Sequence, residues 1–381
     1  MRTWLLPEYV EDILPAQALG IERLRARLLE LFRVHGYELV IPPLLEYTDS
    51  LLTGTGSDLD LRTFKLVDQL SGRMMGLRAD MTPQVARIDA HLLNRRGLTR
   101  LCYCGTVLHT RPRSFTATRE PMQMGAELYG HAGIEADIEI QQLLRAALSA
   151  CGLVDARLDL SHVGVFAALA KHAGVDAATE AALLQALVAK ERPRLWALTE
   201  PLNESSRAAF RLLPDLYGGR EVLDRARQAL PAYPELHAAL DDIAAVMDAN
   251  GGPLSVDLAD LRGYHYHSGI VFAAYHGGLP NAIALGGRYD EVGKVFGRAR
   301  PATGFSLDLR QWVQLAPEAP GANAILAPCV ADAKLRERID ALRAAGEVVI
   351  VDLPGHEQTR AELGCDRQLV LKNGNWEIVS I

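Results

Sequence analysis

The sequence predicts an α+β protein with an antiparallel sheet, flanking helices, a helical insertion and a small C-terminal α/β domain. Short segments rich in β-forming residues are joined by polar turns and not by helices, which favours antiparallel pairing. A block rich in Ala, Leu, Glu and Arg, residues 163–251, interrupts these segments and has helical spacing. A stretch rich in Pro, Ala and Gly, residues 316–324, precedes the expected C-terminal domain, residues 321–381. Residues 1–162 and 252–315 are then expected to form the core domain.

Length and composition exclude several classes of protein. A chain of 381 residues has room for two or three domains, and its 49% hydrophobic and 23% charged residues are typical of a globular protein. No apolar run reaches the roughly 18 residues of a membrane span, and Glu8, Glu11 and Asp12 interrupt the region where a signal peptide would be apolar. The net charge of -7 disfavours general nucleic-acid binding, and five irregularly spaced cysteines indicate reduced thiols. We expect a cytoplasmic protein.

The elements of the expected core follow from residue patterns. A helix is predicted from Ile21, where apolar residues recur at helical spacing until Gly36. The next segment, YELVIPPLLE, contains Pro42-Pro43, which cannot donate to a sheet and therefore marks a strand end or an edge. Further strands are predicted near Met75 and over residues 101–108, 122–130, 269–275 and 281–287.

The insertion and the C-terminal residues are assigned in the same way. The segments AATEAALLQALVAKERPRLWAL and LHAALDDIAAVMDANGG have heptad-like apolar spacing, and Gly251-Gly252 ends the last helix. After the strand AILAP, the segment DAKLRERIDALRAAG places its apolar residues on one helical face. The strand EVVIVDLPG and a hairpin around Asn373-Gly374 complete a small α/β domain.

The segment LRADMTPQVAR carries the first pair of candidate binding residues. Asp80 and Thr82 are two residues apart, so in an extended segment their carboxylate and hydroxyl point to one side and suit an ammonium group. In the alternative interpretation Thr82 is a helix N-cap with Pro83 at the first helical position. The residues of this segment alone do not decide between the two.

Two further segments place polar residues on predicted strands. In MQMGAELYG, Gln123 and Glu127 share one face and flank a glycine where a ligand could approach the backbone. A solvated outer face explains the same pattern. In LGGRYDEVGKVFG, Arg288, Tyr289 and Asp290 follow a double glycine, which on its own is also explained by a bend at the end of a strand.

The segment LRGYHYHSGIVFAAY concentrates rings and one guanidinium. Arg262, Tyr264, His265, Tyr266 and His267 fall within six positions before an apolar strand. The His-x-His pair suggests a zinc site, but no third ligand lies at metal-site spacing. Stacking rings and an arginine that holds a carboxylate bidentately are the favoured interpretation, and no metal is expected.

In this order, the segments resemble the catalytic core of histidyl-tRNA synthetase, a class II aminoacyl-tRNA synthetase, over residues 1–315. EDILP, HGYELVIPPLLE, LRADMTPQVAR, CGTVL through QMGAELYG, RGYHY and GGRYD all fall in register. The resemblance implies a class II synthetase-like fold and a histidine-binding site. By this resemblance Asp80 and Thr82 bind the α-amino group, Gln123 and Glu127 line the pocket, Arg262 lies near the carboxylate, and Tyr266, His267 and Tyr289 surround the imidazole.

The positions that bind ATP in class II enzymes depart from the family pattern. His109 and Arg111 stand where motif 2 has an arginine and a glutamate, and Gln311 stands where motif 3 ends in an arginine. Asp308 falls where a glycine is expected, and Arg310 would restore the contact only if the register slipped by one residue. Because adenylation needs fixed cations around the developing negative charge, synthetase activity is expected to be lost.

The C-terminal residues depart from the synthetase pattern as well. Residues 321–381 are fewer than an anticodon-binding domain has, and they hold seven Lys or Arg against nine Asp or Glu. Their one aromatic residue is Trp376, whereas RNA recognition needs basic surface and exposed stacking rings. We therefore expect no tRNA binding.

A kept histidine pocket, a degraded ATP site and a short tail together resemble the synthetase-like regulatory subunits of ATP phosphoribosyltransferase, the HisZ family. The resemblance implies a non-catalytic protein without a cofactor and without a membrane or tRNA partner. It also implies three partners: the short-form catalytic subunit, a second copy of this chain in the homodimer core of a hetero-octamer, and free histidine as effector. The expected role is activation and feedback control of the first step of histidine biosynthesis.

Two other functions are compatible with the same fold. One is an active histidyl-tRNA synthetase of unusual type, against which the missing motif 2 and motif 3 arginines argue. The other is a synthetase-like RNA-binding sensor, which would need a basic tail or insertion. The sequence leaves open whether a second histidine site lies at a subunit interface and which surface contacts the catalytic subunit.

Overall fold

The computed structural model describes residues 4–53, 57–277, 279–316 and 324–381. The chain divides into two compact units, Met1–Ala316 and Pro317–Ile381. The predicted linker, residues 316–324, and the predicted start of the C-terminal domain fall almost wholly outside the described residues. Among the helices described, none combines the length and the apolar character needed to cross a bilayer.

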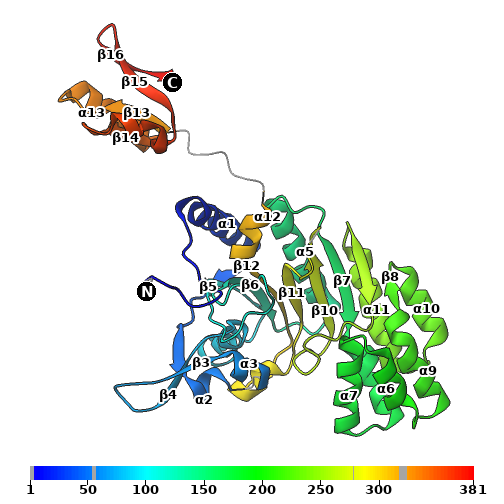
Figure 1. Ribbon diagram of the computed structural model, residues 1–381. Coiled ribbons are helices and arrows are strands. Elements are labelled where there is room, and N and C mark those ends of the chain that lie inside the picture. Colours follow the sequence, from blue (N-terminus) through cyan, green and yellow to red (C-terminus); the bar gives the residue numbers. More distant parts are fainter. Residues whose placement is uncertain (1–3, 54–56, 278, 317–323) are drawn as a thin grey trace. The chain divides into compact units, whose positions relative to one another are not determined.

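The first unit is built on one large sheet (Figure 1). Over the described residues it has nine strands in the order β1-β5-β6-β12-β11-β10-β7-β9-β8. Their bounds are Glu38–Leu39 (β1), Thr99–Thr106 (β5), Met122–Tyr129 (β6), Ala302–Asp308 (β12), Ala284–Arg288 (β11), Ile270–Tyr275 (β10), Arg157–His162 (β7), Leu254–Asp257 (β9) and Tyr217–Gly218 (β8). In this order, each strand from β5 to β7 pairs antiparallel with the next, as predicted. In contrast, β1 joins β5 in parallel, and β9 joins β7 in parallel. The sheet is therefore mixed at its margins.

A smaller sheet and several helices complete the part of this unit that lies before β7. The small sheet has the order β2-β4-β3, with bounds Leu45–Tyr47, Met74–Leu77 and Phe64–Val67. The helices are α1 (Pro15–Val34), α2 (Thr48–Leu51), α3 (Ser57–Arg62), α4 (Thr82–Arg87), the π-helix η1 (Ile88–Leu93) and α5 (Ile134–Ala150). Pro15 opens α1 because a proline fits the first turn, where its missing N–H costs nothing.

The predicted helical insertion contains the helices α6 to α11, which gather beside β7 and β8 (Figure 1). Their bounds are Val163–Ala173, Ala177–Val188, Arg192–Thr199, Glu204–Leu212, Glu221–Ala229 and Pro234–Ala249, with the 3-10 turn η2 at Leu213–Asp215. The Asp176 side chain caps α7 by accepting from the Thr179 N–H, and Gly174 ends α6 in the left-handed conformation. The 3-10 turn η3 (Val292–Phe296) and α12 (Leu309–Leu315) complete the unit.

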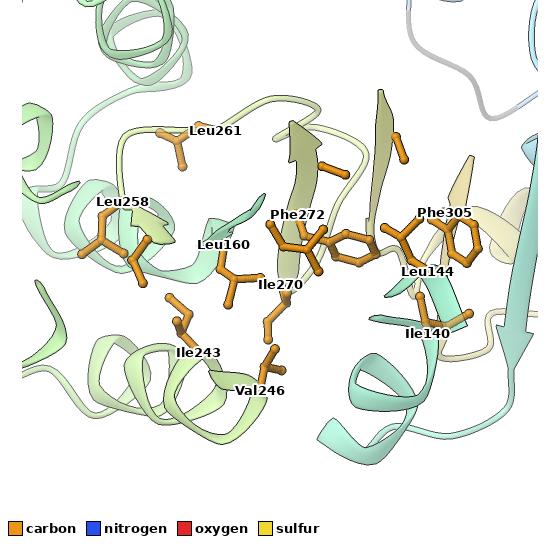
Figure 2. Close-up of a cluster of buried hydrophobic side chains, with 14 of the residues drawn as sticks. Ile140, Leu144, Leu160, Ile243, Val246, Leu258, Leu261, Ile270, Phe272 and Phe305 are labelled. Carbon is orange, nitrogen blue, oxygen red and sulfur yellow. The ribbon is translucent and has the colours of Figure 1, made fainter. Parts of the chain in front are cut away.

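The core of the first unit lies between the large sheet and the helices that cover it. In Figure 2, Ile140 and Leu144 of α5 and Ile243 and Val246 of α11 face side chains of the strands. The strand residues Leu160, Ile270, Phe272 and Phe305 belong to this same buried cluster. At about 25 cal/mol per Å² of apolar surface removed from water, such a cluster is the main source of stability, and it holds the strands in fixed register.

The second unit is a small α/β domain. Its described strands form a sheet in the order β14-β13-β15-β16. The elements are β13 (Ala324–Pro328), α13 (Ala333–Ala344), β14 (Val349–Asp352), the 3-10 turn η4 (Glu357–Leu363), β15 (Cys365–Lys372) and β16 (Asn375–Ser380). Leu335, Ile339 and Leu342 of α13 pack on this sheet, and the predicted hairpin turns at Asn373 and Gly374, both with positive φ.

Candidate functional site

Two side chains of β6 point from the middle of the large sheet into a buried polar cluster. Gln123 and Glu127 lie on one face of the strand, as predicted, with exposed fractions of 6% and 1%. The alternative of a solvated outer face is therefore wrong for both residues. Gln123 accepts from the Met81 backbone N–H at 2.8 Å and donates through Nε2 to Asp80 at 2.9 Å. These two bonds join β6 to the loop between β4 and α4.

Asp80 and Thr82 lie where β4 leads into α4. Oδ1 of Asp80 accepts from the Thr82 backbone N–H at 2.9 Å and from Gln123. Thr82 is the first residue of α4, and the N-cap residue, Met81, makes no side-chain cap bond, so the alternative in which Thr82 caps the helix is wrong. Oδ2 of Asp80 has no hydrogen-bond partner among the described residues. One carboxylate oxygen is thus available to an ammonium group.

Glu127 is held by tyrosine hydroxyls and not by a cation. Tyr103 donates to Oε1 at 2.9 Å, and Tyr289 donates to Oε2. The hydroxyls of Thr82 and Tyr103 are 3.0 Å apart, so Glu127 and the Asp80 loop are connected through Tyr103. Burial raises the pKa of Glu127 from 4.5 to about 8, although both tyrosine hydrogen bonds act in the opposite direction.

The raised pKa of Glu127 makes a testable prediction for stability. Between pH 4.5 and 8 the folded chain keeps a proton that the unfolded chain has released, so this group's contribution to stability decreases as pH rises through that window. Replacing Glu127 with Gln removes the titration while keeping the shape. We expect the melting temperature of Glu127→Gln relative to the unsubstituted chain to be higher at pH 8.5 than at pH 5, measured by differential scanning fluorimetry.

The control for this prediction is the substitution Glu30→Gln on the exposed face of α1. The Arg33 side chain lowers the pKa of Glu30, so stability from this group is lost on acidification, with the opposite sign. A melting-temperature difference for Glu127→Gln that does not change between pH 5 and 8.5 would show that Glu127 is ionised throughout.

Three further rings predicted to surround an imidazole lie beside Glu127. Tyr266 and Tyr289 pack with ring centroids 5.2 Å apart, and Tyr266 meets His267 edge to face at 5.3 Å. The Tyr266 hydroxyl is buried and has no hydrogen-bond partner among the described residues. Burial lowers the pKa of His267 to about 4, so this ring is neutral and its Nδ1, 3.1 Å from the Arg288 carbonyl, donates.

The zinc interpretation of the His-x-His pair is not supported by the geometry. Within the described part of the chain, no group of three or more His, Cys, Asp or Glu residues could hold a metal ion. His265 is exposed and packs against Tyr264, whereas His267 faces the cluster.

Arg262 is the one predicted ligand that binds elsewhere in this structure. Its guanidinium pairs with both oxygens of Asp260, with Nε 2.7 Å from Oδ1, and lies 5.7 Å from the Tyr275 ring centre. Among the described residues, no hydrogen bond or ion pair joins it to another predicted ligand. Its pKa is raised by the Asp260 carboxylate against the effect of burial, so the charge is retained. A contact with a ligand carboxylate would require Arg262 to share or exchange this partner.

Two glycines make room for the cluster. A Cβ on Gly304 of β12 would collide with the Glu127 carboxylate, because Gly304 lies directly opposite Glu127 in the register. A Cβ on Gly125 would collide with the Tyr103 hydroxyl and with the Phe305 carbonyl oxygen, 2.5 Å away. The space over Gly125, predicted to admit a ligand, is therefore filled by Tyr103.

Sequence reasoning missed the two tyrosines that complete the cluster. Tyr103 bridges Thr82 and Glu127, and the Tyr129 hydroxyl lies 3.3 Å from that of Tyr289. The signal for Tyr103 was present, since Gly125 stands between the two inward polar residues of β6 and opposite Tyr103 on β5. A missing side chain on one strand indicates a large one reaching across from its neighbour.

His109, at the position of the motif 2 arginine, points inward. It is 1% exposed, and its Nε2 lies 2.9 Å from the Ala79 carbonyl oxygen, which can only accept. Burial and then the charge of Arg113 lower the pKa of His109 to about 4, so the ring is neutral near pH 7. It therefore supplies no positive charge to a phosphate. Arg111 is exposed.

The motif 3 positions are also engaged within the chain. Gln311 is half-buried on α12 and is uncharged. Arg310 donates to Glu11 at 2.9 Å and to the Glu120 carbonyl at 3.2 Å, with the Glu120 carboxylate at 4.0 Å, so its charge is already balanced. Asp308 accepts from the backbone N–H groups of Met122 and Arg310, each at 3.0 Å, and burial raises its pKa to about 6. It joins β6 to α12.

The sequence comparisons match both units. The histidyl-tRNA synthetase family model matches residues 9–312, and the model of the ATP phosphoribosyltransferase subunit HisZ C-terminal domain matches residues 322–379. A relative from Ralstonia pickettii (strain 12J), named ATP phosphoribosyltransferase regulatory subunit, is 63% identical over 98% of this chain and 97% of its own length. The chain belongs to the ATP phosphoribosyltransferase regulatory subunit family. A second member, from Ralstonia nicotianae, is 62% identical over 99% and 98% of the two chains.

Solved structures agree with this assignment. A crystal structure from Bacillus halodurans C, titled as an ATP phosphoribosyltransferase regulatory subunit/histidyl-tRNA synthetase, has a TM-score of 0.83 at 27% identity and covers 95% of this chain and 96% of that one. Histidyl-tRNA synthetase from Nostoc sp. PCC 7120 has a TM-score of 0.79 at 17% identity, over 100% and 97% of the two chains, and shows the shared fold. The predicted family and the class II synthetase-like α+β fold are confirmed, and family membership gives the chain a regulatory role.

Proposed function

We propose that this chain is the non-catalytic, histidine-sensing subunit of ATP phosphoribosyltransferase. It activates the short-form catalytic subunit in the first step of histidine biosynthesis, and bound histidine converts the same contact into feedback inhibition. The observation that carries the proposal is a buried polar cluster with an open carboxylate oxygen on Asp80. It lies next to the positions that resemble nucleotide-binding positions, where His109 is neutral and Arg310 is already paired.

The chemistry of the pocket matches both ends of free histidine. The open Oδ2 of Asp80 suits the α-ammonium group, with the Thr82 hydroxyl beside it. At the other end, Glu127 and the unpartnered Tyr266 hydroxyl offer groups for the two imidazole nitrogens, beside the packed rings of Tyr266 and Tyr289. A buried site with unpaired polar groups discriminates against ligands that cannot pair them, which favours histidine over apolar amino acids.

The former nucleotide site supports a binding role without adenylation. A guanidinium that clamps the α-phosphate is worth several powers of ten in rate because it meets charge that develops in the transition state. The neutral imidazole of His109 cannot replace it, and Arg310 would have to leave Glu11 and Glu120 to reach a phosphate. We therefore propose that synthetase activity is absent, and that tRNA is not a partner.

Regulation requires two states of the complex that bind histidine with different affinity. The coupling free energy is typically about 1 to 3 kcal/mol, and linkage requires that the catalytic subunit change histidine affinity by the same factor. The proposed assembly is a homodimer of this chain within a hetero-octamer with catalytic subunits, in the cytoplasm. Free histidine is then the effector and not a substrate.

Titration calorimetry and an activity assay test the proposal together. We expect the full chain to bind histidine and not ATP, and to raise the activity of the short-form catalytic subunit in the absence of histidine. Added histidine should then reduce the activity of the complex. The catalytic subunit without this chain should not show that inhibition. Histidine-dependent release of pyrophosphate from ATP by this chain, or an unchanged catalytic activity on mixing, would contradict the proposal.

A further inference from the structure

His109 occupies a place where its side chain supports the backbone of the pocket and not a nucleotide. The residues before Asp80 run beside the end of β5 and the segment that follows it, and three hydrogen bonds join them. Arg78 donates through Nε to the Thr106 carbonyl at 2.9 Å, and the Leu108 N–H donates to the Arg78 carbonyl at 3.0 Å. The third bond is from Nε2 of His109 to the Ala79 carbonyl at 2.9 Å.

This third bond acts on the peptide group that joins Ala79 to Asp80. The Ala79 carbonyl and the Asp80 N and Cα lie in one peptide plane. A hydrogen bond that fixes the carbonyl oxygen therefore also fixes the direction in which the Asp80 side chain leaves the backbone. Asp80 then uses Oδ1 for the Thr82 N–H and Gln123, which leaves Oδ2 open. Without the His109 bond, a buried carbonyl oxygen would lose its partner, and the peptide could rotate to find another.

The other ring nitrogen of His109 shows that this single bond sets the ring's orientation. Nδ1 is buried and has no hydrogen-bond partner among the described residues. The ring therefore gives up one hydrogen bond at some cost and keeps the one to Ala79. The main chain of His109 is fixed as well, since its N–H donates to the Arg119 carbonyl at 2.9 Å and its carbonyl accepts from Arg119 Nε at 3.0 Å.

We propose that His109 is a positioning residue for the amino-acid pocket, which aims the open oxygen of Asp80 at the α-ammonium group of the ligand through its bond to the Ala79 carbonyl. The inference rests on the proposed function, because it concerns the affinity for histidine. The residue at the motif 2 arginine position then has a different role. His109 does not bind a phosphate but orients the group that binds the ammonium.

The test uses two variants of His109 and two ligands. His109→Phe keeps a ring of similar size but has no donor, whereas His109→Gln keeps an N–H that can reach the Ala79 carbonyl. The ligands are histidine and imidazolepropionate, which lacks the α-ammonium group. Titration calorimetry on the full chain should show that His109→Phe weakens histidine binding on the order of tenfold, the size expected for one hydrogen bond, and that His109→Gln restores most of the loss.

The second ligand separates positioning from a general loss of structure. Imidazolepropionate should bind the unsubstituted chain and His109→Phe with affinities within about twofold, since it makes no contact that depends on Asp80. Phe115→Ala, at a 95% exposed position of the same loop, is the matched control and should leave both affinities unchanged. Equal weakening of both ligands, or full histidine affinity in His109→Phe, would overturn the inference; no histidine binding by the unsubstituted chain would instead refute the proposed function.

Discussion

Replacing Asp80 with Asn is expected to lower the affinity for histidine by roughly a hundredfold, because the change removes one charge-assisted contact and turns a donor toward the ligand's ammonium group. Asn keeps an oxygen that can accept from the Thr82 N–H and from Gln123, so the loop should keep its conformation. The NH₂ group then lies where the open Oδ2 was. Titration calorimetry gives the affinity, and a thermal melt checks the fold.

The same variant separates two parts of the regulatory role. Asp80→Asn should still activate the catalytic subunit while inhibition by histidine moves to much higher concentrations. Asp49→Asn is the matched control, because Asp49 is an exposed carboxylate whose ion pair with Arg73 is 3.5 Å long. Normal histidine affinity in Asp80→Asn would show that the ammonium group binds at another place.

Replacing Asp137 with Ala is expected to cost about 3 kcal/mol of the free energy of unfolding, because it removes the buried counter-charge of Arg288 and leaves only Asp290, which is partly exposed and 3.3 Å away. Nε of Arg288 is 2.9 Å from Oδ2 of Asp137, and both side chains are at least nine-tenths buried. Arg288 also donates to the carbonyls of His131 and Gly133, so it ties the end of β11, just before Tyr289, to the start of α5. Urea denaturation measures the loss.

A neighbouring carboxylate on the same helix gives the comparison. Glu135 of α5 is exposed, and its pair with His131 is at the surface, so Glu135→Ala should leave the free energy of unfolding nearly unchanged. If Asp137→Ala proved no more destabilising than Glu135→Ala, Asp290 or water would have to balance the Arg288 charge in the variant. Histidine binding by Asp137→Ala should weaken along with stability, because Tyr289 follows Arg288 directly.

The sequence was informative where the spacing of residues fixed which side chains share a face. The strand alternation of MQMGAELYG placed Gln123 and Glu127 on one face, and the structure buries both. Apolar spacing located α1 from Ile21, although the helix begins earlier, at Pro15. Local patterns could not give the parallel pairings of β1 and β9, because both join strands that are distant in sequence.

Other elements were missed because another signal was stronger. In the segment GFSLDLRQW the resemblance to motif 3 is the stronger signal, and the strand β12, Ala302–Asp308, which pairs with β6, is not predicted. No prediction was made for α5 or β7, which carry much of the core. The bonds of His109 and Arg310 were not predictable, since each joins residues from separate segments whose approach depends on the complete sheet.

Gly304 and Glu127 restrict the substitutions that each position can accept. Because the Glu127 carboxylate occupies the volume that any larger residue on β12 would need, neither position can change freely while its partner stays the same. A variant with a side chain at position 304 would first need a shorter residue at position 127, and it would lose the buried carboxyl group by that change. The buried carboxyl group of this sheet therefore depends on a pair of positions, one of which carries no side chain at all.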